Sequence, residues 1–331
     1  MASKLFPDMT RRTFVRGAAS MAAAGSIPGI AFAQEKFPSK TIEVVTHAGV
    51  GGGTDITARM MMVQAPAELG TELVVVNRTG GSGAAALAYA ASRPRDGHTI
   101  LLITQTHLLT ILRSKNPPVQ YEDIVALARA TEDPQILMVG AKSPYKTAKE
   151  FLEASKSRVL KYGTTQVGGV DHIAVLGFAR QAGLQKPTIV PFRGGGDIVI
   201  NLVGGNVDAA LLNHAEAESQ LKAGEVRGLL TVYPQRVSSL PDTPTAAELG
   251  IQANYSTVRG FVALRGTPED RLKILEEGLV KAMRGKIYQS YLESSGQAAA
   301  SVVGRAEWQA QLDAFHREGR DALAALGTQQ Q

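Results

Sequence analysis

Short apolar runs alternate with amphipathic segments along most of the chain. Runs rich in β-branched residues predict strands at 41–46, 73–76, 99–104, 136–139, 160–162, 188–190, 207–212 and 227–232. A segment beginning near Asp55 and the Ala-rich segment 83–92 predict helices between the first three strands. Strands separated by helix-length segments favour right-handed crossovers, so the pattern predicts an α/β fold of mainly parallel sheets flanked by helices.

The C-terminal part of the chain predicts helices only. Thr267-Pro268-Glu269-Asp270 is typical of a helix start, with a capping residue, a proline and an acidic first turn. Apolar residues then recur at helical spacing: Leu272, Leu275, Leu279 and Met283 in one helix, and Trp308, Leu312 and Phe315 in a last one. We expect the end, 327–331, to be frayed.

The first 33 residues have the three parts of an export signal. The pair Arg11-Arg12 precedes an aromatic residue, a mildly apolar run covers 17–30, and small residues lead to a cleavage site near Ala33. The paired arginines favour the twin-arginine route over the general secretory route. The apolar run, broken by Pro28, is too short and weak to span a bilayer as a helix. We therefore expect a mature protein in the periplasm.

Composition narrows the function further. The whole chain has 35 basic and 30 acidic residues, a net charge of +5. Removal of residues 1–33 leaves 31 basic and 29 acidic residues, a net charge of +2, so the basic character belongs largely to the leader and predicts no nucleic-acid partner. The absence of cysteine excludes disulfides, thiolate chemistry and cysteine-ligated metals. The mature length allows two domains.

A glycine-rich loop follows the first predicted strand. It runs from His47 to Asp55 and contains Gly51, Gly52 and Gly53. Glycines let the backbone turn sharply and approach a ligand, and the free N–H groups of the helix that follows favour a carboxylate or phosphate. The loop matches neither a dinucleotide fingerprint nor a P-loop. A plain strand–helix turn capped by Thr54 or Asp55 explains it equally well.

A second loop of the same kind spans Gly163 to His172 and includes Thr164, Thr165 and Gly168. Two such loops facing each other would form a cleft lined with N–H and hydroxyl donors. The alternative is an ordinary turn in which Asp171 caps the helix and His172 bonds locally.

A third glycine-rich loop follows the strand at 188–190. In it, Arg193 either pairs with a carboxylate or lies solvated on the surface, and Asp197 caps the next helix. Motifs of serine hydrolases, zinc proteases and zinc deaminases are absent. The six histidines are scattered, so no catalytic residue, metal site or cofactor is predicted.

Several segments together resemble the substrate receptors of tripartite tricarboxylate transporters, the Bug family of periplasmic solute-binding proteins. In the second half they are PFRGG at 191–195 with NLVGGNVD at 201–208, KAGEVRGL at 222–229 and LPDTPTAAELG at 240–250. In the first half they are NRTGGSG at 77–83 and DGHTIL at 96–101. The resemblance runs from about Pro38 to near Ala325.

The resemblance implies a two-lobed periplasmic binding fold, type II-like, that closes by a hinge on a small carboxylate in the cleft between its lobes. One lobe would comprise 34–140 plus 255–331 and the other 141–254. The implied function is a cofactor-free, monomeric receptor that delivers its ligand to membrane transporter subunits. A dicarboxylate, a tricarboxylate, an amino acid or an aromatic acid would fit.

The resemblance also implies that the two glycine-rich loops bind the ligand without a compulsory arginine. The residues expected to bind it are His47, Ala48, Gly51, Gly52, Gly53, Thr54, Asp55, Thr104, Gln105, Thr164, Thr165, Gly168, His172 and Asn213. Two positions depart from the family pattern: Ala48 replaces an aromatic residue, and Val258 replaces a tryptophan. These losses predict a wider cleft or a different contact with the ligand.

Two other functions fit the same residues. An exported α/β enzyme could act on small carboxylates with His172 or His47 as its acid–base group, and turnover of the ligand would distinguish it. A sensor subunit that presents ligand to a membrane signalling protein would share the fold and differ only in its partner.

Overall fold

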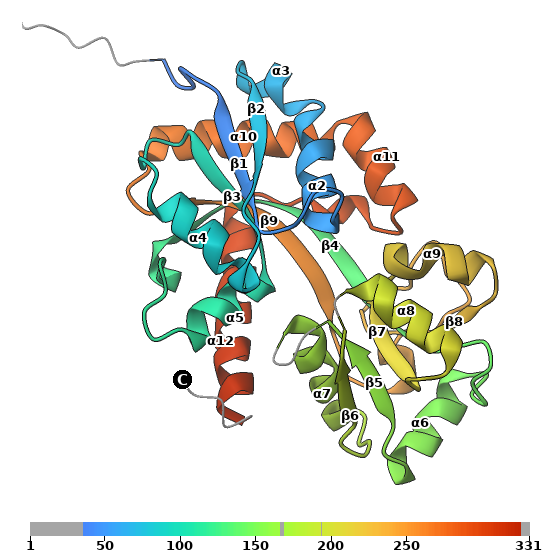
Figure 1. Cartoon of the computed structure of the whole chain (residues 1–331). Coiled ribbons are helices and arrows are strands. Elements are labelled where there is room, and N and C mark those ends of the chain that lie inside the picture. Colours follow the sequence, from blue (N-terminus) through green and yellow to red (C-terminus); the bar gives the residue numbers. More distant parts are fainter. Residues whose placement is uncertain (1–35, 166–168, 193, 326–331) are drawn as a thin grey trace, which may run out of the picture. The chain divides into compact units, whose positions relative to one another are not determined.

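The computed structural model describes residues 36–165, 169–192 and 194–325 (Figure 1). By its internal contacts the chain divides into two units, Met1–Phe37 and Pro38–Gln331, and the second contains every helix and strand of the described residues. The predicted leader, Gly168, Arg193 and the predicted frayed end lie outside the described residues.

The strands are β1 (Ile42–Thr46), β2 (Leu73–Asn77), β3 (Thr99–Thr104), β4 (Ile124–Gly140), β5 (Lys161–Thr164), β6 (Thr188–Pro191), β7 (Ala209–Asn213), β8 (Val226–Thr231) and β9 (Ser256–Leu264). The α-helices are α2 (Gly53–Met62), α3 (Ala65–Leu69), α4 (Ala84–Ala91), α5 (Gln105–Arg113), α6 (Ala148–Ser157), α7 (Val170–Gln181), α8 (Gly195–Gly204), α9 (His214–Lys222), α10 (Glu269–Arg284), α11 (Lys286–Ser294) and α12 (Arg305–Ala325). Short 3₁₀ helices cover Gly81–Gly83, Tyr121–Asp123, Ala247–Leu249 and Ala299–Ser301.

The strands follow the order β2-β1-β3-β9-β4-β7-β5-β6, and β8 also pairs with β4. The pairs β1–β2, β1–β3, β5–β6 and β5–β7 are parallel, whereas β9 and β4 pair antiparallel with their neighbours. The α/β fold is confirmed, and every predicted strand is present. The two parallel groups match the expectation, but they are joined by the antiparallel strands β9, which the pattern did not predict, and β4, of which it predicted only the last part.

The long strand β4 links the two groups (Figure 1). It pairs with β9 from Ile124 to Pro134 and with β7 and β8 from Gln135 to Gly140. The pattern predicted only its last part, 136–139, because charged residues interrupt the apolar run before it. The second strand at the junction, β9, was missed for the same reason, since Arg259 lies within it.

The first group of strands has helices on both faces. Val45, Leu101 and Ile103 pack with α4, α5 and α12 in one cluster that includes Trp308. The alternate residues Val44 and Ile100 are also buried, and alternation turns them to the opposite face, where α2 and α10 lie. Gly260 permits a close approach of α12 on the first of these faces, because a Cβ at this position would lie 2.3 Å from the Trp308 ring. The predicted C-terminal helices are confirmed as α10 and α12.

The second group is also packed on both faces. Leu137 and Val139 of β4 lie in a cluster with Phe151 of α6 and Phe178 of α7. Ile136 and Met138 point the other way and pack against α8 and α9. Burial on both faces explains why residues 136–139 of β4 and most of β7 are continuous apolar runs rather than alternating ones.

Candidate functional site

Polar residues gather where β4 changes partners. Thr131, Asp133 and Gln135 are two residues apart on β4, so their side chains share one face. The strand register places Arg259 of β9 beside Thr131, and Asn213 of β7 beside Gln135. Because the loops after β1 and β5 also begin at carboxyl ends of parallel strands, this is the edge where α/β folds bind ligands.

The first loop is held in shape by Asp55, the third residue of α2. Its Oδ2 accepts the Gly51 N–H at 2.9 Å, and its Oδ1 accepts from Asn77 Nδ2 at 2.8 Å. The same Asn77 amide donates to the Ala48 carbonyl at 2.9 Å. Arg59 pairs with both oxygens of Asp55 at 2.8 and 3.0 Å, and these bonds lower the pKa of Asp55 to about 2.

The N-terminus of α2 is left open by this arrangement. Its N-cap residue is Gly52, and no side chain caps the helix. The first N–H groups of a helix have no intrahelical partner, and together with the helix dipole they favour an anion. Thr54 is buried beside this end. The predicted residues of the first loop therefore form one donor-rich helix start.

Arg259 lies directly against that helix start. Its Nη1 is 3.4 Å from Thr131 Oγ1 and 3.6 Å from Asp133 Oδ2. Its Nη2 is 3.0 Å from the position that a Cβ on Gly53 would occupy, so only glycine fits there without displacement. The Nε atom is buried with no hydrogen-bond partner among the described residues. An arginine thus adds a planar cationic donor to the open helix end.

Histidines border the same space. The rings of His47 and His107 meet edge to face with centroids 4.4 Å apart. Burial, followed by the charge of Arg259, lowers the pKa of His47 to about 4, so this imidazole is neutral at pH 7. Burial also holds the pKa of His107 well below its usual value, and its Nδ1 accepts the Thr104 N–H at 3.1 Å.

The second loop is built around Asp171. Asp171 Oδ2 accepts from the Thr165 hydroxyl at 2.7 Å and from the Thr165 N–H at 3.3 Å, and its Oδ1 accepts from Gln135 Nε2 at 3.1 Å. Thr164 is fully buried, and its hydroxyl has no partner among the described residues. His172 is half-buried, and burial, followed by Lys186, lowers its pKa.

Three other predicted residues hold the strand junction together. Thr104 caps α5, and Gln105 donates to the Ser256 carbonyl at 2.7 Å while accepting the Val258 N–H at 3.0 Å. Asn213 donates to the Asp133 carbonyl at 2.8 Å and accepts from the Thr257 hydroxyl at 2.9 Å. The polar groups of Thr104, Gln105 and Asn213 therefore form hydrogen bonds within the junction and do not point into open space.

A small cavity of about 80 Å³ reaches the junction, and Gln105, Gln135 and Val170 are among its lining residues. Within residues 36–165, 169–192 and 194–325, no cluster of three or more His, Asp or Glu side chains is placed to hold a metal ion. None of the helices in these ranges is long and apolar enough to cross a membrane.

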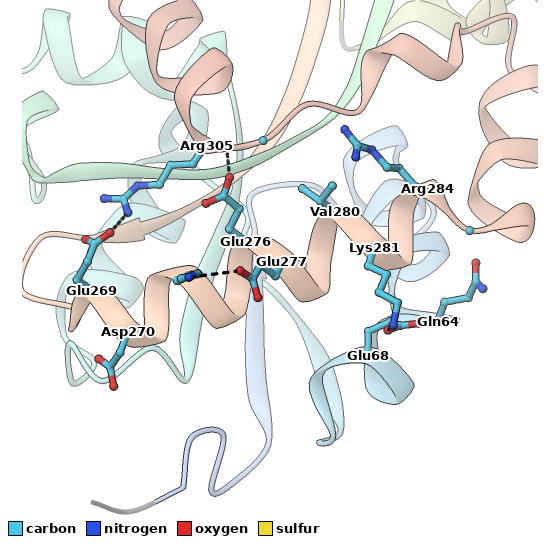
Figure 2. Close-up of a pocket in the computed structure, with 13 residues that line it drawn as sticks. Gln64, Glu68, Glu269, Asp270, Glu276, Glu277, Val280, Lys281, Arg284 and Arg305 are labelled. Carbon is cyan, nitrogen blue, oxygen red and sulfur yellow. Dashed lines mark hydrogen bonds and ion pairs between the residues drawn. The ribbon is translucent and has the colours of Figure 1, made fainter.

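A larger hollow, of about 1040 Å³, lies elsewhere, along the outer face of α10 (Figure 2). Several of its charges are paired with one another: Lys281 binds Glu68 at 2.6 Å, and Arg305 binds Glu269. Most of these side chains are strongly exposed, so such pairs contribute little to stability. We therefore place the site at the strand junction and not in this hollow.

Sequence reasoning missed four residues of the junction. They are Asp133, Gln135, Glu216 and Arg259. One usable signal was present: charged residues inside otherwise apolar strands, such as Arg259 between buried Val258 and Gly260, must have a buried partner or a function.

The fold and the site together define a class, the two-lobed periplasmic solute-binding proteins. Known structures agree. A TctC solute-binding protein from Polaromonas has a TM-score of 0.76 at 25% identity, covering 87% of this chain and 99% of its own. MatC from Rhodopseudomonas palustris, solved with bound malate, has a TM-score of 0.72 at 26% identity, covering 87% of this chain and 100% of its own.

The family follows from the sequence comparison. The model of the tripartite tricarboxylate transporter family receptor matches residues 57–320. A Cupriavidus necator protein, the UPF0065 protein in the gbd 5′ region, is 30% identical over 293 residues, covering 86% of this chain and 88% of its own. The chain belongs to the tripartite tricarboxylate transporter receptor family, which confirms the resemblance found in its motifs.

Proposed function

We propose that this protein is an exported receptor that binds a small organic carboxylate in the periplasm and delivers it, chemically unchanged, to membrane transporter subunits. One observation carries the proposal: the uncapped N-terminus of α2 lies against the Arg259 guanidinium, whose Nε finds no partner in the part of the chain that the structure describes. Both groups are donors to anions, and both are held by the fold before ligand arrives.

The carboxylate lies at the start of α2, where the N–H groups of Gly53 and Thr54 and the Nη2 side of Arg259 donate to it. Neutral His47 borders the ligand without adding charge. The second loop, Gly163 to His172, closes from the other side and includes Gly168. Closure stabilises the bound state because the donors of both loops contact the ligand only when the lobes meet.

The remaining parts of the proposal follow the chain. Residues 1–33 direct export, by the twin-arginine route, and are then removed. The lobes comprise 34–140 plus 255–331 and 141–254, and they close as a monomer. Binding of malate by the relative MatC supports an aliphatic carboxylate as ligand. Ala48, at a position where the family has an aromatic ring, leaves room for a larger ligand.

Calorimetric titration with matched acids and esters tests the proposal. Malate, succinate and citrate are titrated into the mature protein, and their dimethyl or trimethyl esters serve as controls of similar shape without charge. We expect at least one acid to bind with micromolar affinity or better (about −8 kcal/mol) and its ester not to bind. Mass spectrometry after overnight incubation should recover the acid unchanged. Equal binding of the ester, or conversion of the acid, would contradict the proposal.

A further inference from the structure

A single cation lies between the open start of α2 and a buried acid. The Nη2 side of Arg259 faces Gly53, the first residue of α2, whereas its Nη1 lies 3.6 Å from Asp133 Oδ2. A charged hydrogen bond between a nitrogen and a carboxylate is normally about 2.7–2.9 Å long. Asp133 therefore compensates the charge of Arg259 without using all of its donors. The guanidinium can bind a second carboxylate while it still faces the first.

Other acids, but no second cation, lie near Asp133. Asp133 is 4% exposed, and Arg259 is the only cation paired with it in the part of the chain that the structure describes. Asn213, on β7, is neutral and donates to the Asp133 carbonyl. Glu216, on α9, is exposed, and after burial and the charge of Asp171 on α7, the charge of Asp133 raises its pKa. The acids around Asp133 thus add negative charge, although solvent screens that of Glu216.

The remaining titratable groups around this ion pair are neutral at pH 7. Tyr291, on α11, is close enough for the charge of Asp133 to act on it, and Tyr288 is close enough to Arg259. Burial is the main cause that raises the pKa of both phenols. His47, on the first loop, has a pKa of about 4 and is not protonated. None of these side chains supplies a positive charge for a second carboxylate.

A ligand carboxylate at the start of α2 changes the charge balance. Before it binds, one cation faces one buried acid, and afterwards the same cation faces two carboxylates. Burial already raises the pKa of Asp133 to about 6, although Arg259 and the Asn213 amide lower it. A further negative charge nearby disfavours the ionised form of Asp133 still more. Protonation of Asp133 leaves one carboxylate, that of the ligand, beside the cation.

We infer that the ligand carboxylate binds together with one proton, and that Asp133 is the residue that takes up this proton. The inference rests on the proposed function. The proton comes from solvent and returns to it when the ligand leaves. Neutral Asp133 no longer competes for Arg259, whose donors then serve the ligand. Binding therefore tightens as pH falls toward the pKa of Asp133 in the free protein and weakens as pH rises above it.

Calorimetry in two buffers counts the proton. Malate, succinate and citrate are titrated in Tris and in triethanolamine, which carry no negative charge and differ in their enthalpy of ionisation. The difference between the two binding enthalpies, divided by the difference between the ionisation enthalpies, gives the protons taken up per ligand. For the acid that binds most tightly, we expect about 0.5–1 proton at pH 7.5. Its Kd should be about three- to tenfold higher at pH 8 than at pH 7.

Asp133→Asn removes the charge and keeps the shape of the side chain. This variant should take up less than about 0.2 proton and bind equally at pH 7 and pH 8. At pH 8 it should bind more tightly than the wild type, because no acid competes for Arg259. Glu153→Gln, on the exposed face of α6, is the matched control and should behave as the wild type does.

Infrared difference spectra of the wild type provide a second measurement in case Asp133→Asn does not fold. Ligand binding should produce the carbonyl band of a protonated carboxyl group. The band should keep its frequency when the ligand carboxylates carry carbon-13, because it belongs to the protein. Absence of the band, or a shift with the labelled ligand, would contradict protonation of Asp133.

The possible failures of the inference and of the proposed function can be told apart. Binding of an acid without proton uptake by the wild type would overturn the inference and leave the carboxylate receptor standing. Proton uptake that persists in Asp133→Asn and is lost in Glu216→Gln would overturn the assignment to Asp133. Binding of none of the three acids would contradict the inference and the proposed function together.

Discussion

Removing the guanidinium of Arg259 should weaken carboxylate binding strongly, but the single variant is the wrong experiment. Asp133, which is 4% exposed, would lose its cation. Breaking a buried ion pair by removing one partner costs about 3–5 kcal/mol of stability. The informative variant is therefore Arg259→Gln combined with Asp133→Asn, which removes both charges and keeps a donor near Thr131.

The expected size of the effect follows from the contacts. A hydrogen bond to a charged group contributes about 1.5–3 kcal/mol, and about 1.4 kcal/mol corresponds to a tenfold change in Kd. If Arg259 makes one such bond to the ligand, the double variant should bind ten- to a hundredfold more weakly by calorimetry. Arg284→Gln, in the hollow along α10, is the matched control and should bind normally. An affinity within threefold of the wild type in the double variant would refute the role of Arg259.

Three further variants test individual contacts. Gly53→Ala should weaken carboxylate binding about tenfold, because its Cβ would lie 3.0 Å from Arg259 Nη2; Gly49→Ala, with nothing within 4 Å, should bind normally in the same titration. Asp55→Asn should cost about 1–2 kcal/mol of unfolding free energy at pH 6. The pKa of Asp55 is about 2, below the usual 3.8, so the stabilisation by its charged form is present above pH 4 and is lost as pH falls toward 2. Urea unfolding should therefore show a difference between variant and wild type at pH 6 that disappears at pH 2. Glu216→Gln should raise the unfolding free energy of the ligand-free protein at pH 8 and not at pH 5, by less than about 1 kcal/mol because this side chain is exposed and solvent screens its charge. The pKa of Glu216 is raised from 4.5 to about 7, so its ionisation costs stability as pH rises through that range; an equal effect at both pH values would contradict the influence of the neighbouring carboxylates.

Much of the fold could be predicted because its signals are local. The strand β1 is a short run rich in β-branched residues, and the glycine-rich loops after β1 and β5 mark the turns into α2 and α7. The first half of β4 was missed because Arg129 and Glu132 interrupt its apolar pattern. These two charges bind each other at 2.6 Å, and Arg129 also donates to the Ser301 carbonyl. A partner as distant in the sequence as Ser301 leaves no periodic signal.

The candidate site, too, could be predicted from the sequence only in part. The open start of α2 could be predicted, because a strand, a glycine cluster and a helix follow one another in the sequence. The position of Arg259 could not, since its neighbours Gly53 and Asp133 come from other parts of the chain. The sequence alone likewise does not show whether a cation is paired with Asp171, because that depends on which residue packs one turn further along α7.

We propose above all that this receptor holds a carboxylate and releases it unchanged. The most direct measurement is the mass of any small molecule released when the freshly purified mature protein is denatured, followed by calorimetric titration of that compound. We expect a stoichiometric carboxylic acid that rebinds intact with micromolar affinity or better (about −8 kcal/mol). A released compound without a carboxylate, or one that the protein converts into another, would contradict it.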